Sequence, residues 1–384
     1  MNDYPELRLG DLVTPVQDRI VNRTKWHFDK YIAGEHIDSG EVRIRKCGQI
    51  KGNEEVIGSA FHMHFKPGHV LYSTRRAYLR KAGIVDFEGI CSNVTLILQS
   101  NEEKLLQSLL PFILQSEDFV QFAISHSIGS TNPFVKWTDL SKYRLRIPPI
   151  RIQKKISQIL WAIEDNIEKI ENLIEVSEKL KKGLLEELLT KGIGHKGFKK
   201  TELGEIPEDW EVAKIADILT FEYGEGLPED TRKGGKYPVI GSNGIVGYHT
   251  SYTVEGPTIV VGRKGASGQI IWVEDNCWPI DTSYFVKLKR ELSMDYVFHL
   301  LNSLDLIELS QKGAVPGLNR KDVYEKTAAI PPFNEQKKIV SLLREAEQFT
   351  DSLKEHLVET SMLKKKLANS FLSGEFPIPE EDLS

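Results

Sequence analysis

The chain has 384 residues, of which 40% are hydrophobic, a composition typical of globular proteins. A chain of this length normally divides into more than one domain, each with its own hydrophobic core. The formal net charge of −5 argues against a uniformly basic nucleic-acid-binding protein. No apolar run approaches the length of about 18 residues that a membrane span requires, and the first residues are polar and charged, so we expect a cytoplasmic protein.

Residues 1–149 are expected to form the first globular unit. Short β-type runs such as His69–Tyr72 and Val94–Leu98 are bounded by turn residues, which is typical of strands. No acidic residue occurs between Val56 and Val85, although this stretch contains five lysines and arginines. The pattern predicts a local positive surface on a nearly neutral protein.

Residues 150–190 are expected to form a long helix. An Ile-Pro-Pro sequence precedes the segment, and the residue before a proline avoids the helical region, so the prolines mark the start of the helix. Apolar residues then recur at spacings of three and four, which predicts one buried stripe along the helix. The predicted stripe consists of Ile152, Ile156, Ile159, Ile163, Ile167, Ile170 and Ile174.

The second half of the chain repeats this plan. Residues 191–206 are rich in glycine and lysine and are expected to be a linker, and residues 207–332 a second globular unit. Residues 333–376 are expected to form a second long helix, followed by a C-terminal tail, residues 377–384. The predicted apolar stripe of this helix consists of Ile339, Leu342, Leu343, Ala346, Phe349, Leu353, Leu357, Leu363, Leu367 and Phe371.

An internal duplication explains the repetition. The 44 residues from Ile147 align without gaps with those from Ile330, at an offset of 183, and 14 positions are identical. We therefore predict an α+β protein with two α/β domains, each followed by a long helix. The two helices are expected to pair antiparallel as a coiled-coil-like spacer with pseudo-two-fold symmetry. Duplex DNA has the same approximate symmetry, so two unlike domains would suit an asymmetric, bipartite site.

These features resemble the specificity subunits of Type I restriction–modification systems. The resemblance rests on the long helices after Ile-Pro-Pro, on the linker from Phe198 to Trp210 and on the two dissimilar globular units, so it covers nearly the whole chain. It implies target-recognition domains that read DNA, here the segments Tyr31–Ile37, Phe65–Arg76, Ile240–Gly247 and Val261–Gly268. It also implies two methyltransferase subunits as partners, together with translocating endonuclease subunits.

The candidate DNA-binding residues of the first unit belong to two segments. One is the acid-free stretch, where arginines can bind phosphates or read guanine and where hydroxyl groups can make shorter contacts. The other is the acid-free loop of residues 125–136, which lies before the first long helix. An ordinary solvated strand edge is the alternative interpretation. The candidates are Ser73, Thr74, Arg75, Arg76, Tyr78, Arg80, Lys81 and Lys136.

The candidates of the second unit lie on glycine-rich turns and on a second acid-free loop, residues 311–321. Backbone N–H groups and cations on such turns can hold a phosphate, while plain hairpin turns with exposed charges are the alternative. The offset of 183 makes this loop the counterpart of residues 125–136. The candidates are Ser242, Asn243, Tyr248, Arg263, Lys264, Lys312, Asn319 and Arg320.

We expect no catalytic residues, no metal and no cofactor in this chain. It contains no GxxxxGK[ST] phosphate loop and no Asn-Pro-Pro-aromatic signature of adenine methyltransferases. S-adenosylmethionine, Mg²⁺ and ATP are therefore expected on the partner subunits. His62, His64 and His69 lie near one another in sequence, but neither a carboxylate nor a cysteine joins them at a suitable spacing, which argues against a metal site.

Three alternatives remain open from the sequence. The chain could serve a methylation-only or fused Type II-like modification system. It could be a helical adaptor that joins two proteins without reading DNA. It could also be a complete methyltransferase or nuclease with unfamiliar motifs, in which case the purified chain would modify or cut DNA without partners.

Overall fold

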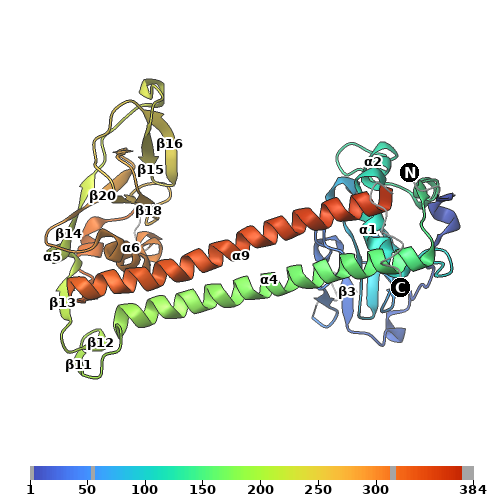
Figure 1. The fold of residues 1–384 in the computed structure, drawn as a ribbon, viewed down its shortest axis with the longest axis horizontal. Helices are drawn as coiled ribbons and strands as arrows, with labels where there is room; N and C mark the ends of the chain where they lie inside the picture. Colours follow the sequence, from blue (N-terminus) through green and yellow to red (C-terminus); the bar gives the residue numbers. More distant parts are fainter. Residues whose placement is uncertain (1–3, 53–56, 312–316, 374–384) are drawn as a thin grey trace. The chain divides into compact units, whose positions relative to one another are not determined.

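The chain forms two compact units, and each combines a globular domain with parts of two long helices (Figure 1). Unit 1 comprises residues 1–171 and 355–384, and unit 2 comprises residues 172–354. The structure, a computed structural model, describes residues 4–52, 57–311 and 317–373. In the described part, no helix is both long and apolar enough to cross a membrane.

The globular domain of unit 1 contains two four-stranded sheets and a short strand pair. One sheet is fully antiparallel with the order β2-β9-β6-β7, and the second has the order β4-β3-β8-β5 with a parallel β3–β8 pair. The pair β1–β10 closes the domain. The strands are β1 Glu6–Arg8, β2 Val13–Pro15, β3 Lys30–Ile32, β4 Gly48–Gln49, β5 Phe61–Phe65, β6 Val70–Ser73, β7 Ala82–Ile84, β8 Gly89–Ser92, β9 Thr95–Ser100 and β10 Arg144–Arg146, and the short helices are α1 Leu110–Gln115, α2 Glu117–Ser125 and α3 Trp137–Leu140.

The globular domain of unit 2 repeats this topology. Its antiparallel sheet β14-β20-β17-β18 matches β2-β9-β6-β7, the pair β13–β21 matches β1–β10, and β15 pairs in parallel with β19 as β3 does with β8. The strands are β13 Glu211–Lys214, β14 Leu219–Tyr223, β15 Tyr237–Gly241, β16 Gly244–His249, β17 Thr258–Gly262, β18 Ile270–Val273, β19 Trp278–Pro279, β20 Ser283–Leu288 and β21 Thr327–Ile330, and the short helices are α5 Ile215–Ile218, α6 Met294–Ser303, α7 Leu306–Gln311 and α8 Arg320–Tyr324. The duplication seen in the long helices therefore extends to the globular domains.

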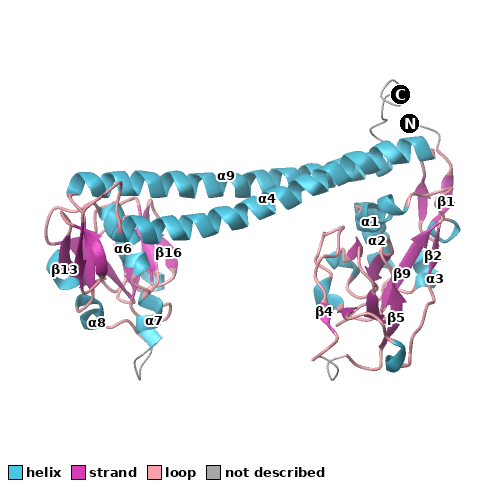
Figure 2. Cartoon of the chain, turned by 90° about the horizontal axis from the view of Figure 1, so that it is seen from below, coloured by secondary structure: helices cyan, strands magenta, loops and turns pink. Residues whose placement is uncertain are grey.

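The two long helices are α4, Ile150–Thr190, and α9, Phe333–Ser373, each of 41 residues. In each unit they lie side by side in opposite directions (Figures 1 and 2). In unit 1, Glu164 of α4 contacts Lys364 of α9, and in unit 2 Ser177 contacts Thr350. The antiparallel pairing predicted from the sequence is therefore confirmed.

The predicted apolar stripes are only partly buried. On α4, Ile156 and Ile167 are buried, but Ile159 is exposed because its neighbour Leu160 packs into the core of the globular domain of unit 1 instead. On α9, Ile339 and Leu343 are buried. Three other stripe residues of α9 are exposed, Leu342, Phe349 and Leu363, so only part of the predicted stripe is buried.

The paired helices also bury polar contacts. In unit 2 the hydroxyl groups of Ser177 and Thr350 lie 2.7 Å apart, and both side chains are buried. In unit 1 the Glu164 carboxylate is completely buried and lies 2.7 Å from the Lys364 ammonium group. Buried polar pairs favour one register, because a slip of the helices would leave each group without its partner.

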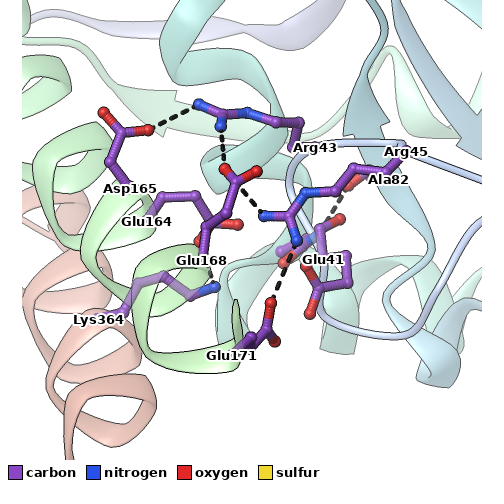
Figure 3. Close-up of polar contacts among 10 residues, drawn as sticks. Glu41, Arg43, Arg45, Ala82, Glu164, Asp165, Glu168, Glu171 and Lys364 are labelled. Atoms are coloured by element: carbon purple, nitrogen blue, oxygen red, sulfur yellow. Dashed lines mark hydrogen bonds and ion pairs between the residues drawn. The ribbon is translucent and has the colours of Figure 1, made fainter. Parts of the chain in front are cut away.

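An ionic network attaches the globular domain of unit 1 to α4 (Figure 3). Arg43 lies 2.8 Å from Asp165 and 2.6 Å from Glu168, while Arg45 lies 3.1 Å from Glu171. The three acidic residues follow one another at spacings of three, so they lie close together on the surface of the helix. These ion pairs bind the arginines of the globular domain to α4.

The segment expected to be a linker is structured. Strands β11, Phe198–Thr201, and β12, Gly204–Pro207, form an antiparallel hairpin. Near the start of α9, Glu335 lies 2.7 Å from His195 Nε2 and accepts a hydrogen bond from the indole of Trp210 at 2.9 Å. These contacts hold the hairpin against the beginning of the second long helix.

The three cysteines are free thiols. Cys91 and Cys277 are buried, and burial raises the pKa of both thiols, that of Cys277 to about 11. Cys47 is only half-buried, because it lies just before the short edge strand β4.

Candidate nucleic-acid interface

In each unit, two of the predicted DNA-binding segments meet at one edge of the antiparallel sheet. In unit 1, the segment after β6 forms a hydrogen bond with the loop before α3, in which Val135 N–H donates to Thr74 O at 3.0 Å. In unit 2, the segment after β17 forms a hydrogen bond with the loop before α8, in which Leu318 N–H donates to Arg263 O at 3.0 Å. Val135 and Leu318 are counterparts at the offset of 183. The same hydrogen bond therefore builds both edges.

We call these surfaces edge 1, residues 74–78 with 133–136, and edge 2, residues 263–265 with 317–320. Thr74 and Arg263 occupy the same place in the repeated fold, as do Lys136 and Asn319. The backbone is thus shared, while the side chains that it presents differ. The two edges therefore share a backbone and differ in chemistry.

Edge 1 exposes three cationic side chains. Arg75, Arg76 and Lys136 are exposed, and none of them forms an ion pair or a side-chain hydrogen bond with any residue that the structure describes. Arg76 has a left-handed backbone with φ of 54°, which is uncommon for a residue with a side chain. A hydrogen bond from Arg76 N–H to Pro133 O at 2.8 Å holds this conformation. Strained backbone of this kind is often found at functional sites.

Two exposed aromatic residues accompany these cations. Tyr78 projects from the turn after Arg76, and Phe134 forms a β-bridge with Arg75. Tyr78 was among the predicted residues, whereas Phe134 was missed. Its position in an acid-free loop gave no signal, because the bridge to Arg75 exists only in the folded domain.

Four other candidates of unit 1 are engaged within the protein. The Thr74 hydroxyl donates to Val94 O at 2.7 Å, and both Ser73 and Thr74 are buried. Arg80 donates to Gln115 O at 2.7 Å and pairs with Glu117 at 2.6 Å, which ties the turn to the start of α2. Lys81 donates to Gly34 O at 2.6 Å. The side chains of Thr74, Arg80 and Lys81 are therefore bonded within the domain.

Edge 2 centres on an aromatic residue that the sequence did not single out. The side chain of Tyr223, at the end of β14, is 50% exposed. The guanidinium carbons of Arg263 and Arg320 each lie 4.8 Å from the centroid of the Tyr223 ring. Cation–π contacts at this distance are attractive and fix the orientation of a planar guanidinium group.

Backbone carbonyl groups hold the same two arginines. Arg263 Nη1 donates to Asp281 O at 3.0 Å, and Arg320 Nη1 donates to Phe221 O at 2.9 Å. A guanidinium group has five N–H donors, so most of the donors of each arginine remain for a ligand. Two oriented arginines on one exposed ring can bind phosphate, or guanine through paired hydrogen bonds.

The glycine-rich turn after β17 lies in close contact with the turn that carries Ser242. A side chain at Gly262 would lie 2.1 Å from Ala266 O and 2.8 Å from Ser242 O, so only glycine fits there. The Ser242 turn therefore packs directly against the loop that carries Arg263 and Lys264. Lys264 is exposed, as is Asn243.

The remaining candidates of unit 2 are placed differently. Tyr248 is exposed on β16, five residues beyond Asn243, which corresponds to about 17 Å of strand, so it lies away from the turn. Asn319 accepts a hydrogen bond from Lys321 N–H at 3.1 Å and so caps α8, although it is exposed. Lys312 lies outside the described residues.

A profile of the family described as "Type I restriction modification DNA specificity domain" matches residues 2–178 and 207–360. The chain belongs to this family. The two matches cover most of the chain and agree with the duplication, so the chain is a Type I specificity subunit with two recognition domains.

Curated relatives that match over most of their length have the same description. A putative Type I restriction enzyme MjaX specificity subunit from Methanocaldococcus jannaschii is 26% identical over 375 residues, covering 90% of this chain and 86% of the relative. The MjaVIII specificity subunit of the same organism is 24% identical over 421 residues, covering 98% and 93%. The relatives thus match the specificity subunit over both of its domains.

Solved structures share the fold. A chain in a structure described as "Structural basis underlying complex assembly and conformational transition of the type I R-M system" aligns with a TM-score of 0.64 and 18% identity, covering 98% of this chain and 99% of that one. A Type I restriction–modification S subunit from M. genitalium aligns with a TM-score of 0.61 and 16% identity, covering 99% and 98%. The predicted fold class is therefore confirmed.

Proposed function

We propose that each recognition domain of this specificity subunit reads one half of an asymmetric, bipartite DNA site, through edge 1 and edge 2. The observation that carries the proposal is the shared hydrogen bond, Val135 N–H to Thr74 O and Leu318 N–H to Arg263 O, which builds the same frame in both domains. The side chains on that frame differ. Arg75, Arg76 and Lys136 occupy edge 1, and the two arginines on Tyr223 occupy edge 2. Different side chains imply different half-sites.

The long helices serve as the docking surface for methyltransferase subunits. On α4 three large apolar residues, Leu173, Val176 and Leu180, are exposed at spacings of three and four, so they form one stripe. On α9 Phe349, Val358 and Met362 are also exposed. Exposed apolar stripes contribute nothing to the stability of an isolated helix pair. A helix of a partner protein that packs on them would remove them from water. Endonuclease subunits would join the same complex for cleavage.

The subunit itself performs no chemistry. The sequence contains neither a phosphate loop nor an adenine-methyltransferase signature. The methyltransferase and endonuclease subunits would accordingly hold S-adenosylmethionine, Mg²⁺ and ATP. A host that has only the methyltransferase partner would use the same subunit for methylation alone.

A domain exchange tests the reading of half-sites. Residues 1–149 are replaced by the same domain of another specificity subunit, and the chimaera is expressed with its methyltransferase subunits. Long-read sequencing then maps methylated adenines in the host genome. We expect one half of the recognised site to change and the other half, with the spacing, to stay. The reciprocal exchange of residues 207–332 should change the other half. A change of both halves by either exchange would contradict the proposal.

A further inference from the structure

A cluster of histidines and carboxylates lies in the globular domain of unit 1, outside edge 1. His64, on β5, is only 3% exposed. Its Nδ1 lies 2.7 Å from Asp18 Oδ2, and its Nε2 lies 2.8 Å from Glu88 Oε1. The expectation that no carboxylate joins the histidines was therefore wrong. Asp18 and Glu88 come from segments 46 and 24 residues away, which the sheet brings to the strand.

A neutral imidazole between two carboxylates leaves one of the two contacts unsatisfied. A neutral imidazole has one N–H group, and its other nitrogen carries a lone pair, so it can donate to only one of two carboxylates. The second carboxylate oxygen would then face a lone pair. A further proton shared among these groups, or a metal ion, removes this repulsion.

A second imidazole favours the metal ion. His27 Nε2 lies 3.2 Å from the same oxygen atom, Glu88 Oε1, that meets His64 Nε2. The ligand atoms of His27, His64 and Glu88 all lie within 4.8 Å of one another. Bonds of about 2.0–2.1 Å in a tetrahedral site place ligand atoms about 3.3 Å apart, so small movements would suffice to close the site around one ion.

We propose that His27, His64 and Glu88 bind one Zn²⁺ ion, with Asp18 orienting His64 through its other ring nitrogen. Two imidazoles and a carboxylate are a ligand set that zinc favours, and a carboxylate on the far nitrogen of a liganding histidine is a common supporting contact. His27 is exposed and Glu88 partly exposed, so water can take the fourth position. The Phe28 ring, stacked on His64 at a centroid distance of 5.1 Å, shields the other side.

The second histidine cluster of the chain does not have this arrangement. His195 meets Glu335 through Nε2 at 2.7 Å and Asp209 through Nδ1 at 3.5 Å. The group has a single imidazole, and its two ring nitrogens face different carboxylates. Both oxygens of Glu335 also accept hydrogen bonds, one of them from Trp210. This cluster holds the β11–β12 hairpin in place.

Zinc at the proposed site would join three segments of the recognition domain. His27 lies in the loop before β3, His64 on β5, and Glu88 in the turn before β8. All three strands belong to the sheet β4-β3-β8-β5. An ion that binds only the folded domain stabilises it by mass action, so the unfolding temperature should rise with the concentration of zinc.

Metal titration of the full-length chain tests the proposal. The chain is stripped with EDTA and titrated with Zn²⁺ by calorimetry, and with Co²⁺ by visible absorption. We expect one equivalent that is lost, or weakened at least tenfold, in His27→Ala and in Glu88→Gln. Both side chains lie at the surface, so these variants should fold. The Co²⁺ spectrum of the wild-type chain should have the intense bands of a tetrahedral site.

His62→Ala is the matched control. His62 lies on the same strand, two residues from His64, and its ring meets Ser59 O at 3.2 Å instead of the cluster. It should bind zinc as the wild type does. Equal binding by the wild type, His27→Ala and Glu88→Gln would overturn the proposal, as would the absence of binding in the wild type.

Discussion

The carboxylate of Glu164 on α4 lies 2.7 Å from the ammonium group of Lys364 on α9, and Glu164 is completely buried. Removing only the cation leaves a buried charge without a partner, which is more costly than removing both charges. We therefore expect Lys364→Met to lower the free energy of unfolding by about 3–5 kcal/mol. Denaturant unfolding of the full chain, followed by circular dichroism, measures this loss.

The double variant Glu164→Leu/Lys364→Met provides the control. It removes both charges and keeps the volume nearly constant, so it should be more stable than Lys364→Met alone. Hydrogen exchange of the α4 amides around Glu164 should likewise be slower in the double variant than in Lys364→Met. If the double variant were less stable than the single one, the pair would not be the source of the effect.

Glu41 makes the stability of unit 1 depend on pH. Burial raises the pKa of the Glu41 carboxyl group, and the negative charge of Glu164 raises it further. The folded protein therefore binds the proton more tightly than the unfolded chain. The free energy of unfolding falls as the pH rises from the unfolded pKa through the folded pKa.

We therefore expect Glu41→Gln to raise the unfolding temperature at pH 7.5 and to have little effect at pH 4. Thermal unfolding at several pH values between 4 and 7.5 measures the difference. Glu35→Gln, a change at an exposed glutamate of the same domain, is the control and should match the wild type throughout. A Glu41→Gln variant that is less stable than the wild type at pH 7.5 would refute the prediction.

The long helices were the most predictable part of the fold. Periodic apolar residues and the Ile-Pro-Pro boundaries placed α4 and α9 to within a few residues. The buried faces were less predictable. A helix of 41 residues packs against a partner helix along part of its length and against a globular domain along another, so no single stripe describes it. Leu160 is buried by the domain, while Ile159 beside it is exposed.

The sites were less predictable than the fold. Arg75 and Arg80 look alike in the sequence, since both lie in the same acid-free stretch. In the fold Arg80 reaches Glu117 and Gln115, whereas Arg75 has no such partner among the described residues. Tyr223 gave no signal, because Arg263 and Arg320 come from distant loops. Contacts between distant segments decide which cation is available, and local sequence does not contain them.

The two arginines of edge 2 should contribute more to DNA affinity than ordinary surface charges do, because Tyr223 fixes their orientation. Arg263→Ala and Tyr223→Ala should each weaken binding of the cognate duplex by the complete methyltransferase complex, by about 1–3 kcal/mol if Arg263 reads a base. Arg263→Lys keeps the charge but loses the planar stacking on Tyr223, so it should restore only part of the affinity. Fluorescence anisotropy with cognate and unrelated duplexes measures both changes.

The salt dependence separates the two possible roles of Arg263. If Arg263 contacts a phosphate, its loss weakens cognate and unrelated duplexes equally and lowers the salt slope by about one. If Arg263 reads a base, its removal mainly lowers the affinity for the cognate duplex. Lys337→Ala, which removes an exposed charge at the start of α9, is the control. An Arg263→Ala variant as tight as this control on every duplex would exclude edge 2 from DNA binding.

The exposed stripe on α4 makes a separate prediction about assembly. Leu180 is 67% exposed, so Leu180→Glu should alter the free energy of unfolding by no more than about 0.5 kcal/mol. A charge in the centre of an apolar interface is costly, however, so the variant should bind methyltransferase subunits much more weakly. Lys182→Gln changes the net charge by the same amount on another face of α4 and should leave assembly intact. Light scattering of the reconstituted complexes distinguishes them. Full assembly of Leu180→Glu would show that the methyltransferase subunits dock elsewhere, and the stripe would then need another partner.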